Sequence, residues 1–332
     1  MVDNVVLCVK LYLSNMIRIE RKKSNNKPYF YLSERILINK KHKKIQVFLG
    51  KTVPKKIVDF YDALQVKELK LLDVRITEGE FLLEHLELFW LKKIEKSKVQ
   101  WKYFNAQLGA LQQKLLLRTF SVRFIYESNA IEGSKLAETE VAAIVENKYL
   151  KKSIPPKEII EVQNSITCFE LLSSGTFILN QKHLKNLHAV LVEGLDIPIG
   201  FKKQAIVVNN KETVSPKEVR QELTKLFKWY TSSSSTLHPF ERAIIFHNRF
   251  EHIHPFTDGN GRVGRLLLNW MLMEKGYGFI LFKNSSKTAY ISALDKADEG
   301  RYRSLLKLST NTYARTIKNF VPKTQCRRAL WF

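Results

Sequence analysis

The stretch at residues 254–265 constrains this chain more than any other part of its sequence. It places one imidazole, one carboxylate, three glycines and two guanidiniums in the order His-Pro-Phe-Thr-Asp-Gly-Asn-Gly-Arg-Val-Gly-Arg. An apolar run at 266–273 follows at once, so the stretch is predicted to be a loop that enters a helix. Glycines let the backbone approach a ligand, and the first N–H groups of a helix have no partner within it. The stretch therefore predicts an anion site, above all for phosphate.

Single side chains in this stretch indicate separate roles. Arg262 and Arg265 are three positions apart, so they share a helix face and can reach the same anion. Asp258 supplies a hard oxygen ligand that suits the Mg²⁺ accompanying phosphates. His254 is the nearby group that changes charge close to neutral pH, which makes it the candidate general base.

Two simpler interpretations of the same stretch were weighed. Residues 259–264 also fit the dinucleotide pattern G-x-G-x-x-G, which requires a buried strand immediately before it. Residues 243–252 have a helical pattern instead, and Pro255 follows, so we reject that interpretation. A polar loop that merely caps a helix would explain Asp258 and Asn260. It would not explain a histidine and two arginines at one turn, so we favour a catalytic site.

The stretch at 254–265 resembles the Fic motif, H-P-F-x-D/E-G-N-G-R-x-x-R, at every fixed position, and a weaker resemblance extends over about residues 115–320. The resemblance implies a mainly α protein, a Fic-type helical bundle with a β-hairpin flap. Most Fic proteins transfer AMP from ATP to a protein hydroxyl. Doc-type kinases carry Lys at the position of Gly261, so this chain looks like the nucleotidyl-transferring branch.

The resemblance also implies roles for individual residues. Phosphate contacts would come from Gly259, Asn260, Gly261, Arg262 and Arg265. Asp258 would hold Mg²⁺, His254 would be the general base, and ATP would be the substrate. Tyr290 falls where relatives often carry an aromatic residue beside the adenine, although a tyrosine on a helix is more often part of the core.

A second short motif lies well before the first. Ser128-x-x-x-Glu132-Gly133 resembles the inhibitory motif S/T-x-x-x-E-G/N of autoinhibited Fic proteins. The resemblance implies that Glu132 pairs with Arg265 and blocks the place of the ATP γ-phosphate, since a carboxylate competes with phosphate for one guanidinium. The alternative is a helix that ends at Gly133 with Glu132 in solvent.

A break in the helical pattern at 194–216 predicts a hairpin ahead of the motif. Residues 204–208 are extended, Asn209-Asn210 is a turn, and residues 213–214 could return. In Fic proteins such a flap aligns the target segment by strand pairing. Gly200-Phe201-Lys202 stands where G-x-Y/F-R is common, with Lys for Arg, and the usual His after the flap is absent. A purely structural hairpin fits the same residues.

The remaining patterns divide the chain into four parts. Apolar residues alternate at period two over 16–50 and predict a three- or four-stranded meander. We predict a small basic β-meander in 1–53, a helical linker in 54–114, the Fic domain with its inhibitory helix in 115–320, and a basic tail in 321–332. Within them, residues 101–118 and 136–150 are each expected to form one helix.

The net charge of the chain indicates which kinds of partner it could bind. The chain of 332 residues has 55 basic and 32 acidic residues, a net charge of +23, which favours acidic partners. Lysines and aromatics at the N-terminus would fit a nucleic-acid or acidic-protein docking module. They also describe an ordinary sheet packed on the helical body, which we favour.

The compartment follows from cysteines and hydropathy. Cys8, Cys168 and Cys326 are far apart with no metal-ligand spacing, so a reducing cytoplasm is expected. Residues 5–13 are apolar but interrupted by Lys10, and no window is long enough to span a bilayer, so no membrane association is expected.

Together these patterns predict a protein adenylyltransferase restrained by Glu132 that modifies a Ser, Thr or Tyr hydroxyl of a target protein or of the chain itself. AMP removal and transfer from another nucleotide are the related alternatives. A docking regulator with a dormant Fic site is the alternative from another class, and a homodimer is a candidate assembly.

Overall fold

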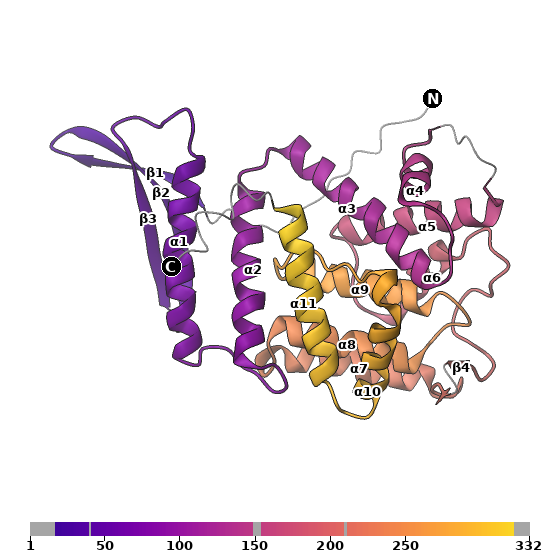
Figure 1. Ribbon diagram of the computed structural model, residues 1–332. Helices are drawn as coiled ribbons and strands as arrows, with labels where there is room; N and C mark the ends of the chain where they lie inside the picture. Colours follow the sequence, from indigo (N-terminus) through magenta and orange to yellow (C-terminus); the bar gives the residue numbers. More distant parts are fainter. Residues whose placement is uncertain (1–16, 40, 149–153, 209–210, 322–332) are drawn as a thin grey trace.

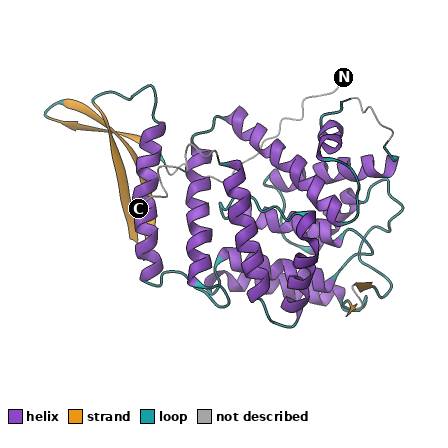
Figure 2. Ribbon diagram, viewed as in Figure 1, coloured by secondary structure: helices purple, strands orange, loops and turns teal. Residues whose placement is uncertain are grey.

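The computed structural model describes residues 17–39, 41–148, 154–208 and 211–321. The predicted turn at Asn209-Asn210, the apolar start at 5–13 and the basic tail after residue 321 lie outside these ranges. The described part is mainly helical, with a three-stranded sheet at one end and a very short hairpin at the other (Figures 1 and 2). This confirms the predicted fold class.

The sheet comes first in the chain and is a plain antiparallel meander. Its strands are β1 (Arg18–Ser24), β2 (Lys27–Ile38) and β3 (Lys41–Gly50), in that spatial order. The β1–β2 turn uses Asn25 and Asn26, both with positive φ (48° and 62°), the backbone that a two-residue hairpin requires and asparagine tolerates.

The helices follow in one long series. They are α1 (Val58–Thr77), α2 (Leu88–Ala106), α3 (Ala110–Ile131), α4 (Glu138–Val145), α5 (Pro156–Ser173), α6 (Gln181–Leu191), α7 (Val219–Ser232), α8 (Pro239–Ile253), α9 (Asn260–Glu274), α10 (Lys287–Asp298) and α11 (Arg303–Phe320). Short 3₁₀ turns are η1 (Ser233–Ser235) and η2 (Asn284–Ser286), and the hairpin pairs β4 (Val207–Val208) with β5 (Lys211–Glu212).

Helices α8 and α9 are the centre of the bundle. They pack on each other, while α3, α5 and α6 contact α9, and α7, α10 and α11 contact α8. Both are buried along most of their length, which explains the apolar run at 266–273. The loop that joins α8 to α9 is therefore held by the core on both sides.

A separate, smaller core joins the sheet to the bundle. One face of the sheet packs on α1 through Leu32, Ile36, Ile45 and Leu49, and α1 in turn lies against α2 (Figure 1). The core that covers the sheet therefore includes both helices of the segment predicted as a linker.

Two predicted helices are shorter than expected. Residues 101–118 do not form one helix, because α2 ends at Ala106 and α3 begins at Ala110. Gly109 starts the new helix, with its N–H donating to the Gln112 side chain. The helix expected over 136–150 covers only Glu138–Val145, and Asn147 follows in a left-handed conformation (φ 52°) that a continuing helix cannot accommodate.

In the described part of the chain, no helix is both long and apolar enough to cross a membrane.

Candidate active site

The loop between α8 and α9 turns sharply at each end. His254 ends α8 with φ 50° and ψ 61°, and Gly259 precedes α9 with φ 81°. Left-handed backbone costs a residue other than glycine roughly 1–2 kcal/mol, so His254 is held in a strained position by what surrounds it. The carboxyl end of α8 and the amino end of α9 consequently meet at this loop.

Asn260 clamps the loop from inside. Its Oδ1 accepts from the N–H of Phe256 at 2.9 Å, and its Nδ2 donates to the carbonyl of Phe256 at 2.9 Å. Asn260 is only 2% exposed, so its side chain is out of reach of a ligand in this arrangement. Only its backbone N–H, in the first turn of α9, remains suited to the predicted phosphate contact.

His188 of α6 packs against the loop between α8 and α9. Its ring stacks on Phe256 with centroids 3.8 Å apart and planes 4° apart, and its Nε2 lies 3.1 Å from the carbonyl oxygen of Asp258. Since a carbonyl can only accept, this nitrogen carries the proton. Burial lowers the pKa of His188 to about 4, so the ring is neutral at physiological pH.

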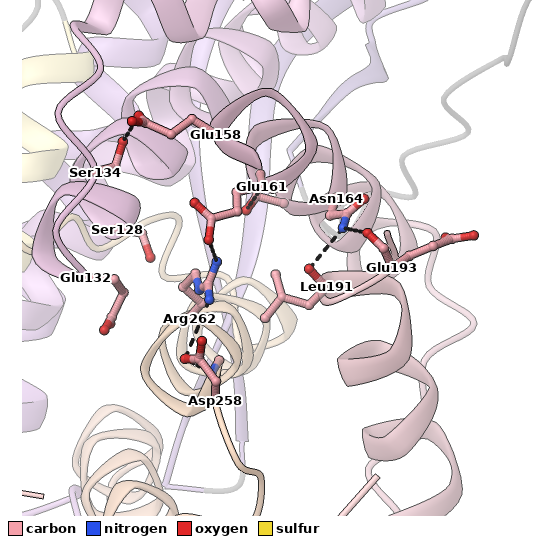
Figure 3. A network of polar contacts seen from close by, with 12 residues as sticks. Ser128, Glu132, Ser134, Glu158, Glu161, Asn164, Leu191, Glu193, Asp258 and Arg262 are labelled. Atoms are coloured by element: carbon pink, nitrogen blue, oxygen red, sulfur yellow. Dashed lines mark hydrogen bonds and ion pairs between the residues drawn. The ribbon is translucent and has the colours of Figure 1, made fainter. Parts of the chain in front are cut away.

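The two arginines of the motif are each held by an acid from a different helix. Arg262 lies between Glu161 of α5, at 3.3 Å, and Asp258, at 3.7 Å (Figure 3). Arg265 donates to Glu132 Oε1 at 2.6 Å. The predicted pairing of Glu132 with Arg265 is therefore present as a contact.

Ser128 completes the surroundings of Arg265. The guanidinium donates through Nε to Ser128 Oγ and through Nη2 to the Ser128 carbonyl, both at 3.0 Å. Burial opposes ionisation of Glu132, but the charge and hydrogen bond of Arg265 outweigh it and lower the pKa of Glu132. Glu132 is thus an anion in contact with the motif. It lies directly after α3, and Gly133 ends the turn that follows this helix.

Gly261 allows this close approach. A Cβ at Gly261 would lie 2.5 Å from Glu132 Oε1 and 2.9 Å from Arg265 Nη1. A side chain at this position would force Glu132 or Arg265 to shift, so glycine leaves room for the pair as it stands.

His254 presents one ring nitrogen to the site. Its Nδ1 lies 3.3 Å from the carbonyl oxygen of Glu251, so Nδ1 carries the proton and the lone pair is on Nε2. Burial lowers the pKa of His254, which keeps the ring neutral near pH 7. A neutral imidazole with an unoccupied Nε2 is the form that can accept a proton.

Lys202 connects the flap region to this loop. Its N–H donates to the carbonyl of Pro255 at 2.9 Å, and its Nζ donates to Thr213 Oγ1 at 2.6 Å and to the carbonyl of Ile253 at 3.2 Å. Phe201 bridges Phe256 in antiparallel fashion beside it. Burial lowers the pKa of Lys202 to about 8. The segment before the hairpin is therefore anchored to the motif.

A cavity of about 310 Å³ opens between the hairpin and α10, with His254 in its wall. Residues of β5, α8 and α10 line the rest of it, among them Glu212, Asp295 and Asp298. A chain segment that pairs with the hairpin would pass this cavity on its way to His254.

Tyr290 lies behind the site. Its side chain is 2% exposed, its hydroxyl shares a hydrogen bond with His247 Nε2, and Phe282 covers its ring at 4.6 Å between centroids. Its ring offers no open face to a base in this arrangement.

Asp258 could supply a single carboxylate ligand to a magnesium ion. Its side chain is 57% exposed, and Oδ1 accepts from the N–H of Gly259, which leaves Oδ2 open. Among the described residues there is no group of three or more His, Cys, Asp or Glu that could hold a metal ion. Mg²⁺ often binds through one carboxylate together with substrate phosphates, and a single open carboxylate suits that mode.

Three residues of this site were not assigned a role from the sequence. Glu161 and His188 lie on α5 and α6, and no motif marks them. In the sequence, Lys202 stands out only as a departure from the flap pattern. An amphipathic pattern can place such residues on a helix but cannot say which partner they meet.

Comparison with known proteins agrees with this geometry. Residues 178–272, which include α6 and most of α9, match the Fic/DOC family. This region is a Fic/DOC domain.

Named relatives of the Fic/DOC domain are adenylyltransferases. "Protein adenylyltransferase Fic" of Nematostella vectensis is 28% identical over 73% of this chain and 58% of its own length. A "probable protein adenylyltransferase" of Aquifex aeolicus is 41% identical over 36% of this chain and 37% of its own. The chain thus spans about half the length of the curated relatives it matches.

Solved structures share the fold. A Fic domain containing signaling protein from Bacteroides thetaiotaomicron has a TM-score of 0.64 at 21% identity and covers 72% of this chain and 99% of its own. Fic-1 of C. elegans has a TM-score of 0.59 at 23% identity and covers 78% and 80%. At these identities the likeness establishes a Fic fold.

Proposed function

We propose that this protein transfers AMP from ATP to a Ser, Thr or Tyr hydroxyl of a target protein, which could include the chain itself. The observation that carries the proposal is the neutral His254, with its Nε2 lone pair, beside the start of α9 and two buried arginines. The adenylyltransferase names of the relatives support it.

The phosphates of ATP would lie over the first turn of α9. The backbone N–H groups of Asn260 and Gly261 have no acceptor within the helix, and the helix dipole favours an anion there. Arg262 and Arg265 would neutralise the outer phosphates. Tyr290 is left out of the proposed contacts because it is buried.

Asp258 would hold Mg²⁺ through its open oxygen. When bound, this ion would supply positive charge at the phosphates.

His254 would then act as the general base. Its Nε2 would take the proton from the target hydroxyl, whose oxygen would attack the α-phosphorus in line. The bond from that phosphorus to the pyrophosphate oxygen would break, and pyrophosphate would leave with its charge balanced by the arginines. The hydrogen bond from Nδ1 to the Glu251 carbonyl would orient the ring throughout.

Glu132 would restrain this reaction. It occupies the guanidinium that an outer phosphate would need, and its carboxylate would repel that phosphate. ATP would bind in a reactive position only when Glu132 leaves Arg265.

The test is transfer of label from α-labelled ATP with Mg²⁺, measured on the chain itself and on added lysate proteins. His254→Ala should abolish transfer. Glu132→Gly should raise it about tenfold or more, because the hydrogen bond to a charged group that it releases is worth about 1.5–3 kcal/mol.

A matched control is Glu127→Gly on the same helix, whose carboxylate accepts from the N–H of Asn284 and touches neither arginine of the motif in any contact described here. It should leave transfer near the wild-type rate. Equal label on the Glu132 variant and the wild type would refute the restraint. Persistent label on the His254 variant would refute the base.

Removal of AMP from a modified protein is the second candidate. The ionised carboxylate of Glu132 is 41% exposed beside the site, where it could orient a water molecule. Release of AMP by the wild type that is lost in Glu132→Gly would favour this direction.

A further inference from the structure

The sheet has one face that no other described part of the chain covers. Side chains alternate along β2, so Phe30, Leu32 and Ile36 face α1 while Tyr29 and Tyr31 face the other way. In Figure 1 the sheet stands at the edge of the molecule, with α1 between it and the bundle. The uncovered side, which we call the open face, therefore points away from the helical body.

Aromatic rings form the middle of the open face. Phe48 pairs with Tyr31 across the β2–β3 ladder, and the two ring centroids are 5.3 Å apart. Tyr29 lies 6.1 Å from Phe48 on the same face. The side chain of Phe48 is 51% exposed, although burying it on α1 would have been favourable. The cluster therefore has one exposed ring, Phe48, beside two half-buried tyrosines, and such a surface suits a partner with flat rings.

Cations surround these rings. The Lys22 ammonium lies 4.6 Å above the Tyr31 ring and donates to Gln46 Oε1 at 2.9 Å. Arg35 and Lys44 oppose each other in the ladder next to them. The three strands together carry nine basic and two acidic residues, so this element is more basic than the chain as a whole.

The two acids offset only a small part of this charge. Glu34 faces away from the open face and bonds to Lys102 and Tyr103 of α2. Glu20 lies on the open face but pairs with both Arg18 and Lys44. The open face thus combines net positive charge with accessible rings, the two properties that recognise a polyanion made of aromatic bases.

We propose that the open face of the N-terminal sheet binds single-stranded nucleic acid. Lys22 and Arg35 contact the phosphate backbone, and a base stacks on the exposed ring of Phe48. An acidic peptide would satisfy the cations but would leave the rings unused. A duplex would satisfy the cations while keeping its bases stacked inside. The single strand is the partner that uses both features.

The experiment measures binding of the full chain to fluorescein-labelled oligonucleotides of about 20 nucleotides, single-stranded and duplex, by anisotropy at about 50 and 200 mM salt. Phe48→Ala should weaken single-strand binding about fivefold or more, while Phe48→Tyr should retain it. Because Phe48 is half exposed, neither change should prevent folding, and circular dichroism checks this.

A charge-reversal pair tests the backbone contacts. Lys22→Glu with Arg35→Glu should weaken binding and reduce the slope of log affinity against log salt by about one to two. The control pair, Lys228→Glu with Lys307→Glu, makes the same charge change at exposed positions on α7 and α11. It should leave most of the affinity intact, and so should His254→Ala.

Three results would overturn the proposal. One is no binding of the single strand at the lower salt concentration. Another is an equal loss for the control pair, which would make the binding a property of overall charge. The third is duplex binding as tight as single-strand binding with Phe48→Ala unaffected, because the rings would then have no role.

Discussion

At the scale of single residues, the site depends on the protonation state of His254. Burial is the largest influence on its pKa and lowers it, and the nearby charge of Lys202 acts in the same direction. A depressed pKa keeps the imidazole neutral, so the base is active above that pKa and is lost as the pH falls through it. We expect transfer by Glu132→Gly, followed against pH, to decline on the acid side only below the ordinary histidine pKa of 6.5.

Lys202→Met should shift the acid side of this pH profile, the range in which activity falls as His254 becomes protonated. Removing a positive charge beside His254 should raise the pKa of His254, so activity should be lost at a higher pH than before. Lys203→Met, an exposed neighbour, is the matched control and should leave the profile unchanged. If activity falls at the same pH in both variants, the charge of Lys202 does not influence the pKa of His254.

At the scale of elements, the site depends on how closely α8 and α9 pack. A Cβ at Gly264 of α9 would overlap Glu251 Oε1 and lie 3.1 Å from His247 Nδ1, both on α8. Since the Glu251 carbonyl also orients His254, a displaced α8 would disturb the base as well as the packing.

Gly264→Ala should therefore cost about 1–3 kcal/mol of stability, as overpacking usually does, and should reduce transfer. Gly109→Ala is a suitable control, because a Cβ at Gly109 would meet only Gln112 Oε1 at 3.8 Å. Thermal unfolding and the AMP assay measure the two effects. Normal stability and activity in the Gly264 variant would mean that the helices can separate at little cost.

At the scale of the whole molecule, a partly buried cation links the sheet to α1 and α2. Lys102 of α2 bonds to Glu34 of β2 at 2.7 Å and also to Glu68 of α1. Burial, followed by the charge of Glu68, raises the pKa of Glu34, so its ionised form depends on the neighbouring cation. The sheet that we propose as a nucleic-acid surface is thus attached through a charged contact.

Lys102→Met should destabilise this junction by about 3–5 kcal/mol at neutral pH, because two buried carboxylates would face each other without a cation. Glu34 has a raised pKa, so protonation of its carboxylate relieves the repulsion, and the loss of stability should shrink as the pH falls toward the ordinary carboxyl pKa of 4.5. Hydrogen exchange in β2 and α1 would locate the effect.

Lys92→Met provides the comparison. Lys92 also joins α2 to α1, pairing with Asp73 at 2.8 Å, but the side chains are 49% and 45% exposed. Loss of this ion pair should lower the free energy of unfolding by less than about 1 kcal/mol at any pH. Equal effects of the two substitutions would contradict the importance assigned to burial.

The sequence by itself determined the local features of this protein. Alternation at period two predicted the meander, and the motif at 254–265 predicted a loop entering a helix, because both signals come from neighbours along the chain. The same local reasoning failed at the helix expected over 101–118, where a break at Gly109 overrode a continuous apolar stripe.

Apart from the contact of Glu132 with Arg265, which the family resemblance implied, only the tertiary structure decided which groups meet. Arg262 and Glu161 are 101 positions apart, and their contact depends on how α5 packs on α9. Tyr290 faces the core and Tyr31 faces solvent, although both are tyrosines in amphipathic elements. Periodicity tells which residues share a face, whereas the packing of distant elements decides whether that face is covered. That is the physical reason why the motif could be found in the chain but most of its surroundings could not.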